Sequence, residues 1–85
     1  MATRVRGIGK SVHSSDQTAF CALMVEARKK AGLTQAALAR KLRKPQSFVA
    51  KYEGGERRLD VVEFVAVSRA IGADPARILR ALLKR

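Results

Sequence analysis

Gly32-Leu-Thr-Gln-Ala-Ala-Leu-Ala-Arg-Lys-Leu42 and the segment that follows it almost at once, Pro45-Gln-Ser-Phe-Val-Ala-Lys-Tyr-Glu-Gly-Gly55, decide the fold of this chain. Thr34 is well placed to cap a first helix that ends at Leu42. Pro45 suits the first turn of a second helix, which runs to Glu53 and is ended by the two glycines. The pattern predicts two helices separated by a tight basic turn. Because each has only about two turns, both need partners in a packed domain.

Apolar periodicity predicts a further helix before this pair. It begins at Asp16 or Gln17, capped by Ser15 or Asp16, and ends at about Ala31, where Gly32 fits the C′ position. One face of it is apolar at i, i+3 and i+4 spacing, with Phe20, Leu23, Met24, Ala27 and Ala31.

Two more helices are predicted after the pair. The segment Asp60-Val-Val-Glu63 has the spacing of a capping box, and the helix it opens ends at Gly72. Asp74 and Pro75 then form a cap and first position for a last helix that ends near Leu83. No alternating β pattern extends beyond a few residues. The sequence therefore predicts an all-α domain of five helices.

The charge of the chain is large and unevenly placed. Eighteen Lys and Arg against seven Asp and Glu give a net charge of +11 on 85 residues, which implies a polyanionic partner or surface. Residues 27–52 contain eight basic residues and no acid, whereas five of the seven acids lie between Glu53 and Asp74. Such segregation by sign indicates one phosphate-facing side.

The length allows one small domain, 16–85, preceded by a basic arm, 1–15. The arm carries Arg4, Arg6 and Lys10, and two interpretations stay open: it enters a DNA minor groove, or it is a solvated tail. Because the core of so short a chain supplies only a few kcal/mol, oligomerisation is a plausible support.

Composition excludes several classes of protein. Cys21 is the only cysteine and His13 the only histidine, which leaves no internal disulfide, metal site or catalytic pair. The chain has no Gly-rich phosphate loop and no paired carboxylates, so we predict neither an enzyme nor a cofactor. No apolar run approaches the roughly 18 residues of a membrane span, and residues 1–15 lack the apolar stretch of a signal peptide. A reduced, cytoplasmic setting is the simplest expectation.

The residues of the helix pair resemble a known family. The runs Leu33-Thr-Gln-Ala-Ala-Leu-Ala39 and Gln46-Ser-Phe-Val-Ala-Lys-Tyr-Glu53, then Gly55 and Ala70-Ile-Gly72, are similar to the phage-repressor and Cro type of helix-turn-helix, the Xre family. The resemblance covers about residues 20–82. It implies a lambda-repressor-like fold and a sequence-specific regulator of transcription, a repressor, that binds double-stranded DNA.

The resemblance also places the base contacts. In this family the second helix of the pair lies in the major groove and its N-terminal part meets base edges. The matching positions here are Gln46, Ser47, Ala50 and Lys51. Gln pairs well with adenine and Lys donates to guanine, although Gln46 could also be solvated and Lys51 could reach a phosphate. Phe48 either touches a thymine methyl or packs back onto the first helix of the pair.

Contacts with the DNA backbone are implied at a second group of positions. Gln35 matches the glutamine that holds a phosphate and orients the first reading residue. Arg43 and Lys44 occupy the turn, where the family usually has Gly and an apolar residue, and Pro45 replaces its usual Ser or Thr cap. This departure strains the backbone if the Arg43 position needs a positive φ. The full expected set is Thr34, Gln35, Arg43, Lys44, Arg57 and Arg58.

Two other sets of residues receive structural roles. Arg28 and Glu53 match a family ion pair between the first helix and the end of the reading helix. The last two helices carry more apolar residues than one inward stripe needs, and we expect the surplus, Phe64, Ile78, Leu82 and Leu83, to form a homodimer surface. A fully buried fourth helix is the alternative.

Rival functions remain open at this stage. The chain could be a controller protein or an antitoxin that acts partly by contact with a toxin. It could also be a basic protein that binds nucleic acid without reading bases, in which case affinity would be equal across sequences and steeply dependent on salt.

Overall fold

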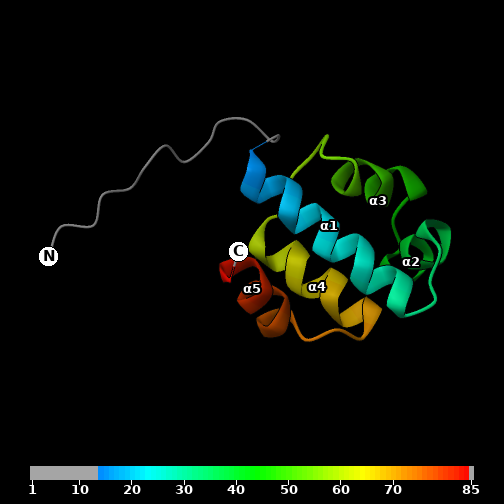
Figure 1. The fold of residues 1–85 in the computed structure, drawn as a ribbon. Helices are drawn as coiled ribbons and strands as arrows, with labels where there is room; N and C mark the ends of the chain where they lie inside the picture. The colour runs from blue at the N-terminus through cyan, green and yellow to red at the C-terminus, as the bar shows by residue number, and fades with distance from the viewer. Residues whose placement is uncertain (1–13, 85) are drawn as a thin grey trace, which may run out of the picture.

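The computed structural model describes residues 14–84, which form five α-helices and contain no strand (Figure 1). The all-α prediction is confirmed. The helices are α1 (Ser15–Lys30), α2 (Gln35–Leu42), α3 (Gln46–Glu53), α4 (Val61–Ile71) and α5 (Pro75–Leu83). Most of the basic arm, with its arginines and His13, lies outside the described residues.

Side-chain caps set the starts of four helices. The Ser14 hydroxyl accepts a hydrogen bond from the Gln17 amide at 3.1 Å, so the cap of α1 is Ser14 and not Ser15 or Asp16, and the helix begins one residue earlier than expected. The predicted caps Thr34, Asp60 and Asp74 are confirmed, and Asp60 forms the full capping box with Glu63. Local hydrogen-bonding groups thus determine these boundaries.

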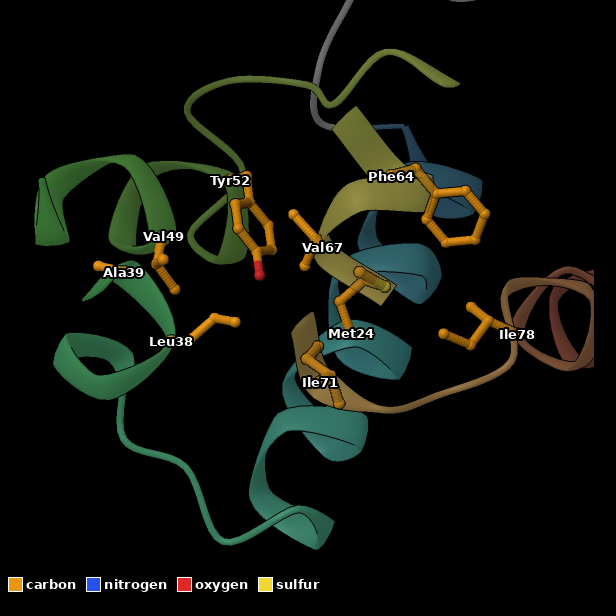
Figure 2. Close-up of a cluster of buried hydrophobic side chains, with 9 residues drawn as sticks. All are labelled: Met24, Leu38, Ala39, Val49, Tyr52, Phe64, Val67, Ile71 and Ile78. Carbon is orange, nitrogen blue, oxygen red and sulfur yellow. The ribbon is translucent and has the colours of Figure 1, made fainter. Parts of the chain in front are cut away.

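One core holds all five helices together (Figure 2). Its nine buried side chains come from every helix, and most of them lie between the α2–α3 pair on one side and α1 and α4 on the other. They are Met24, Leu38, Ala39, Val49, Tyr52, Phe64, Val67, Ile71 and Ile78. Because α2 and α3 are only eight residues long, this shared burial fixes their orientation.

The turn between α2 and α3 is left-handed at a residue that is not glycine. Arg43 has φ 56° and ψ 42°, the conformation that Gly32 and Gly72 supply after α1 and α4. A side chain at such a position costs roughly 1–2 kcal/mol relative to the ordinary helical region. The departure noted in the sequence is therefore real, and the turn forms in spite of it.

Pro45 precedes α3 and does not belong to its first turn. Its backbone is extended, with φ −66° and ψ 154°, and α3 begins at Gln46 without a side-chain cap. The φ of proline suited the first turn, while the family resemblance put Pro45 at the cap; its ψ shows it to be the N-cap. The first turn of α3 therefore needs restraint from elsewhere in the molecule.

Packing leaves one side of α3 uncovered. α3 packs against α1 and α2, α2 also packs against α4, and α5 packs against α1 and α4. In Figure 1, α2 and α3 lie at one end of the molecule and α5 at the other. The helix pair can therefore approach a large partner without involving α5.

Candidate nucleic-acid interface

The two faces of α3 differ in exposure. Val49 and Tyr52 are fully buried and hold the helix to the core, whereas Gln46, Ser47 and Lys51 are exposed on the other side. Ala50, the fourth predicted reading residue, is half-buried. The spacing i, i+1 and i+5 brings the three polar side chains onto one side of a helix. The structure therefore brings the predicted reading residues together on an open surface.

Exposed cations surround this surface. Of the eight basic residues between 27 and 52, only Arg28 is buried. The exposed ones are Lys29, Lys30, Arg40, Lys41, Arg43, Lys44 and Lys51. Thr34 and Arg58, also predicted to contact phosphate, are exposed as well. Such a set of solvated cations attracts the phosphate backbone over the whole α2–α3 end of the domain.

A nearly buried ion pair fixes the C-terminal end of α3. The Arg28 guanidinium donates to both carboxylate oxygens of Glu53, from Nε at 2.7 Å and from Nη2 at 3.0 Å. Its Nη1 donates to the Leu33 carbonyl at 2.8 Å. The hydrogen bonds to Glu53 raise the pKa of Arg28 above its usual value, against the opposing effect of burial. The structure thus places Arg28 and Glu53 in the ion pair that the family resemblance implied.

Gln35 joins this network. Its side-chain nitrogen donates to Glu53 Oε1 at 2.9 Å, a bond between α2 and α3 that the sequence did not indicate. The amide carries a second N–H, so this bond does not exclude the expected phosphate contact. The orientation of the Gln35 side chain is therefore set by a hydrogen bond to the end of α3 as well as by its place in α2.

Arg57 lies in a second cluster, at the other end of α3. It donates from Nη1 and Nη2 to the two carboxylate oxygens of Glu63 at 3.1 and 3.0 Å, and its Cζ lies 4.8 Å from the centre of the Phe48 ring. Lys44 Nζ lies 5.5 Å from the same ring. The bonds from Arg57 and then from the Asp60 amide lower the pKa of Glu63. The sequence suggested Arg57 for the DNA backbone and Glu63 for the capping box, but it did not indicate that the two pair, because they are separated by the loop before α4.

Two of the four predicted dimer residues belong to the core. Phe64 is 6% exposed and contacts the Phe20 ring edge-on at 5.4 Å, and Ile78 is 8% exposed. They offer little surface to a partner because they already fill the space between α1, α4 and α5. The large apolar side chains that are exposed in the described residues are Val61, Val62, Leu79 and Leu83, and Leu82 is half-buried. The surplus of apolar residues is real, but on α4 the exposed ones are Val61 and Val62 and not Phe64.

Cys21 is buried in α1, where its thiol donates to the Tyr52 carbonyl at 3.2 Å. No three His, Cys, Asp or Glu side chains among residues 14–84 are grouped as metal ligands. Within the same range no helix has the length and apolar character to cross a bilayer.

A short helix pair, an open polar face on its second helix and a surrounding field of cations define a DNA-binding helix-turn-helix protein. The family profile described as helix-turn-helix matches residues 24–78. An XRE-family like protein from Pseudomonas syringae pv. tomato str. DC3000 is 48% identical, with 86% of this chain and 89% of that chain covered and a TM-score of 0.80. The chain therefore belongs to the XRE family of helix-turn-helix proteins, and it is a DNA-binding transcription regulator of that type.

A second solved structure shares the fold at lower identity. It is a mutant of the restriction-modification controller protein C.Esp1396I, 20% identical, with 84% of this chain and 90% of that chain covered and a TM-score of 0.75. No curated protein matches the sequence.

Proposed function

We propose that this protein is a sequence-specific transcriptional repressor whose α3 reads the major groove of a two-fold operator. The observation that carries the proposal is the outer face of α3, where Gln46, Ser47 and Lys51 are exposed together while Val49 and Tyr52 fix the helix to the core. A glutamine amide and a lysine ammonium distinguish bases by their hydrogen-bond patterns. Ala50 between them is small enough to allow close approach to a base edge.

Phosphate contacts fix the register of the complex. We assign them to Thr34, Gln35, Arg43, Lys44 and Arg58, all of which lie at the ends of α2 and α3 or in the loop that follows. Phosphate contacts position a protein on the duplex but carry no base information. Arg57 does not belong to this set, because two hydrogen bonds hold its guanidinium on Glu63.

A homodimer would place two copies of α3 on one side of the duplex, about one DNA turn apart. Leu82 and Leu83, the exposed or half-buried members of the expected set, support this proposal together with Leu79 on the same helix. The same residues would equally serve a toxin partner. Sedimentation of the isolated protein separates these possibilities: a dimer supports self-association, and a monomer at micromolar concentration contradicts it.

Selection from a random duplex library at near-physiological salt tests the reading function. An enriched inverted repeat would support a dimeric reader and give its operator. Gln46→Ala should then relax preference at one base pair, whereas Arg43→Ala should weaken binding to all duplexes alike. Salt-dependent binding without enrichment would contradict the proposal and favour a basic protein that binds DNA without reading bases.

A further inference from the structure

Four side chains from separate parts of the chain gather beside the first turn of α3, and we call them the Phe48 clamp: Lys44, Phe48, Arg57 and Glu63. Lys44 precedes α3, Phe48 belongs to it, Arg57 lies in the following loop and Glu63 is in the first turn of α4. The clamp therefore links the start of the reading helix to α4, an element that does not pack against α3 as closely as α1 and α2 do.

The start of α3 is the part of the helix that most needs such a link. Its N-cap is Pro45, which makes no side-chain hydrogen bond to the helix, and the helix is only eight residues long. Helices this short are marginal without tertiary contacts. Gln46 and Ser47, the first two residues of α3, are exposed and have no buried side chain of their own to hold them. Phe48, which is half-buried, is the first residue of α3 that is not exposed.

Contacts on Phe48 are well defined. Its ring meets the Tyr52 ring edge-on at 5.7 Å, Arg57 Cζ lies 4.8 Å from its centre and Lys44 Nζ lies 5.5 Å from it. A guanidinium at this distance from an aromatic ring is attracted by the ring quadrupole. The bidentate bond to Glu63 fixes the plane of that guanidinium, which a single-point contact would not do.

Glu63 is itself fixed. Its Oε1 accepts from the Asp60 amide at 2.9 Å, and its own amide donates to Asp60 Oδ1 at 2.7 Å. The carboxylate that orients Arg57 is thus part of the capping box of α4 and cannot turn freely. A chain of defined contacts runs from the start of α4, through Arg57, to the ring of Phe48.

We infer that Arg57 and Glu63 are positioning residues for base reading, which act through Phe48 to set the orientation of Gln46 and Ser47. The inference rests on the proposed function. It differs from the expectation that Arg57 grips the DNA backbone. Arg57 has further N–H groups, but the Glu63 carboxylate that it holds offsets its charge and repels a phosphate. The inference also assigns a role to Glu63, an acidic residue beside the start of α3: its carboxylate orients Arg57.

The test uses changes that keep the fold and, at Arg57, the charge. Arg57→Lys retains the cation but loses the bidentate bond to Glu63 and the contact of the guanidinium with the ring. Glu63→Gln keeps the capping box, which accepts Glu or Gln at this position, but removes the charged partner. Arg69→Lys, at an exposed arginine in the last turn of α4, is the control for the conservative change from Arg to Lys. For each variant, the Kd for the selected operator and for bulk duplex DNA is measured over a range of salt concentrations.

Positioning predicts a loss of preference. Arg57→Lys and Glu63→Gln should each lower the ratio of operator to bulk affinity by roughly tenfold, and the double variant should lose little more, as expected for groups that act as one unit. The salt dependence of bulk binding should stay as in the wild type, and Arg69→Lys should keep the wild-type ratio. Because both DNAs are titrated with the same preparation, partial unfolding does not change the ratio.

A phosphate role for Arg57 predicts the opposite pattern. Arg57→Lys would then keep the ratio, and Glu63→Gln would strengthen binding to all DNA by removing a negative charge. That result would overturn the inference while the proposed function stands. If the wild type itself prefers no duplex, the proposed function fails, and the inference fails with it.

Discussion

The two ends of α3 are held by two Arg–Glu ion pairs of very different character. At the C-terminal end, the side chains of Arg28 and Glu53 are 10% and 4% exposed and have further hydrogen bonds to Leu33 and Gln35. At the N-terminal end, those of Arg57 and Glu63 are 39% and 28% exposed. Removing one partner leaves a buried charge only in the first pair, since water solvates the charges of the second. The same Arg–Glu chemistry therefore stabilises the fold at the C-terminal end of α3, whereas at the N-terminal end we infer that it orients the helix.

The largest expected effect separates the two ends by stability. Glu53→Ala should lower the free energy of unfolding by about 3 kcal/mol, because Arg28 stays buried without its carboxylate and Gln35 loses its acceptor. Glu63→Ala should lower it far less. Urea unfolding of both variants, followed by circular dichroism, measures the difference. Similar losses for the two variants would contradict the contrast between the ends.

Tyr52, next to Glu53, contributes a buried hydroxyl to the C-terminal end of α3. Its hydroxyl is buried and has no hydrogen-bond partner among residues 14–84, and burial raises its pKa far above the ordinary value of 10.0. Tyr52→Phe should therefore raise stability by about 1 kcal/mol. The folded wild type favours the neutral phenol. Its free energy of unfolding is therefore unaffected by ionisation of Tyr52 below about pH 10 and falls as the pH rises further.

The alkaline loss can be followed directly. Tyr52 is the only tyrosine of a chain without tryptophan, so ultraviolet absorbance of tyrosinate reports its ionisation alone. Wild type and Tyr52→Phe share every lysine, and a stability difference between them that does not grow above pH 10 would show that the hydroxyl is solvated.

A substitution at Arg43 tests the strain of the turn that precedes the N-terminal end of α3. Arg43→Gly relieves the left-handed strain, but it also makes the unfolded chain more flexible, so stability should rise by less than about 1 kcal/mol. Loss of one phosphate contact should reduce the slope of log affinity against log salt by about 0.9. Arg40→Ala is the control, because it removes one exposed positive charge from within α2, where the backbone is not strained. A more stable variant with unchanged salt dependence would remove Arg43 from the DNA contacts.

Acid pH should produce the smallest effect, at the exposed end. The pKa of Glu63 is lowered below its ordinary 4.5, chiefly by the hydrogen bond from Arg57. The ion pair therefore stabilises the protein above about pH 4.5, and this contribution is lost as the pH falls through the lowered pKa. Thermal unfolding of the wild type and of Glu63→Gln should converge in acid. A gap that stays constant with pH would show that ionisation of Glu63 contributes nothing.

Local signals in the sequence predicted the helices well and the contacts between them only in part. Thr34, Asp60 and Asp74 act within three residues of themselves, so their caps could be identified directly. Apolar spacing placed Phe64 and Ile78 among the residues that must be covered, but it could not say whether the core or a partner covers them. The core does, because α1, α4 and α5 meet there.

The sequence by itself determined the five helices, the polar outer face of α3 and the strongly basic segment around it. Helix caps and apolar periodicity depend on residues close together in the chain, and charge is counted directly from the sequence. Only the tertiary structure decided that Gln35 bonds to Glu53 and that Arg57 bonds to Glu63 beside Phe48. These contacts join residues from different elements. Their existence depends on the angles at which helices pack, and those angles follow from the shape of the whole core.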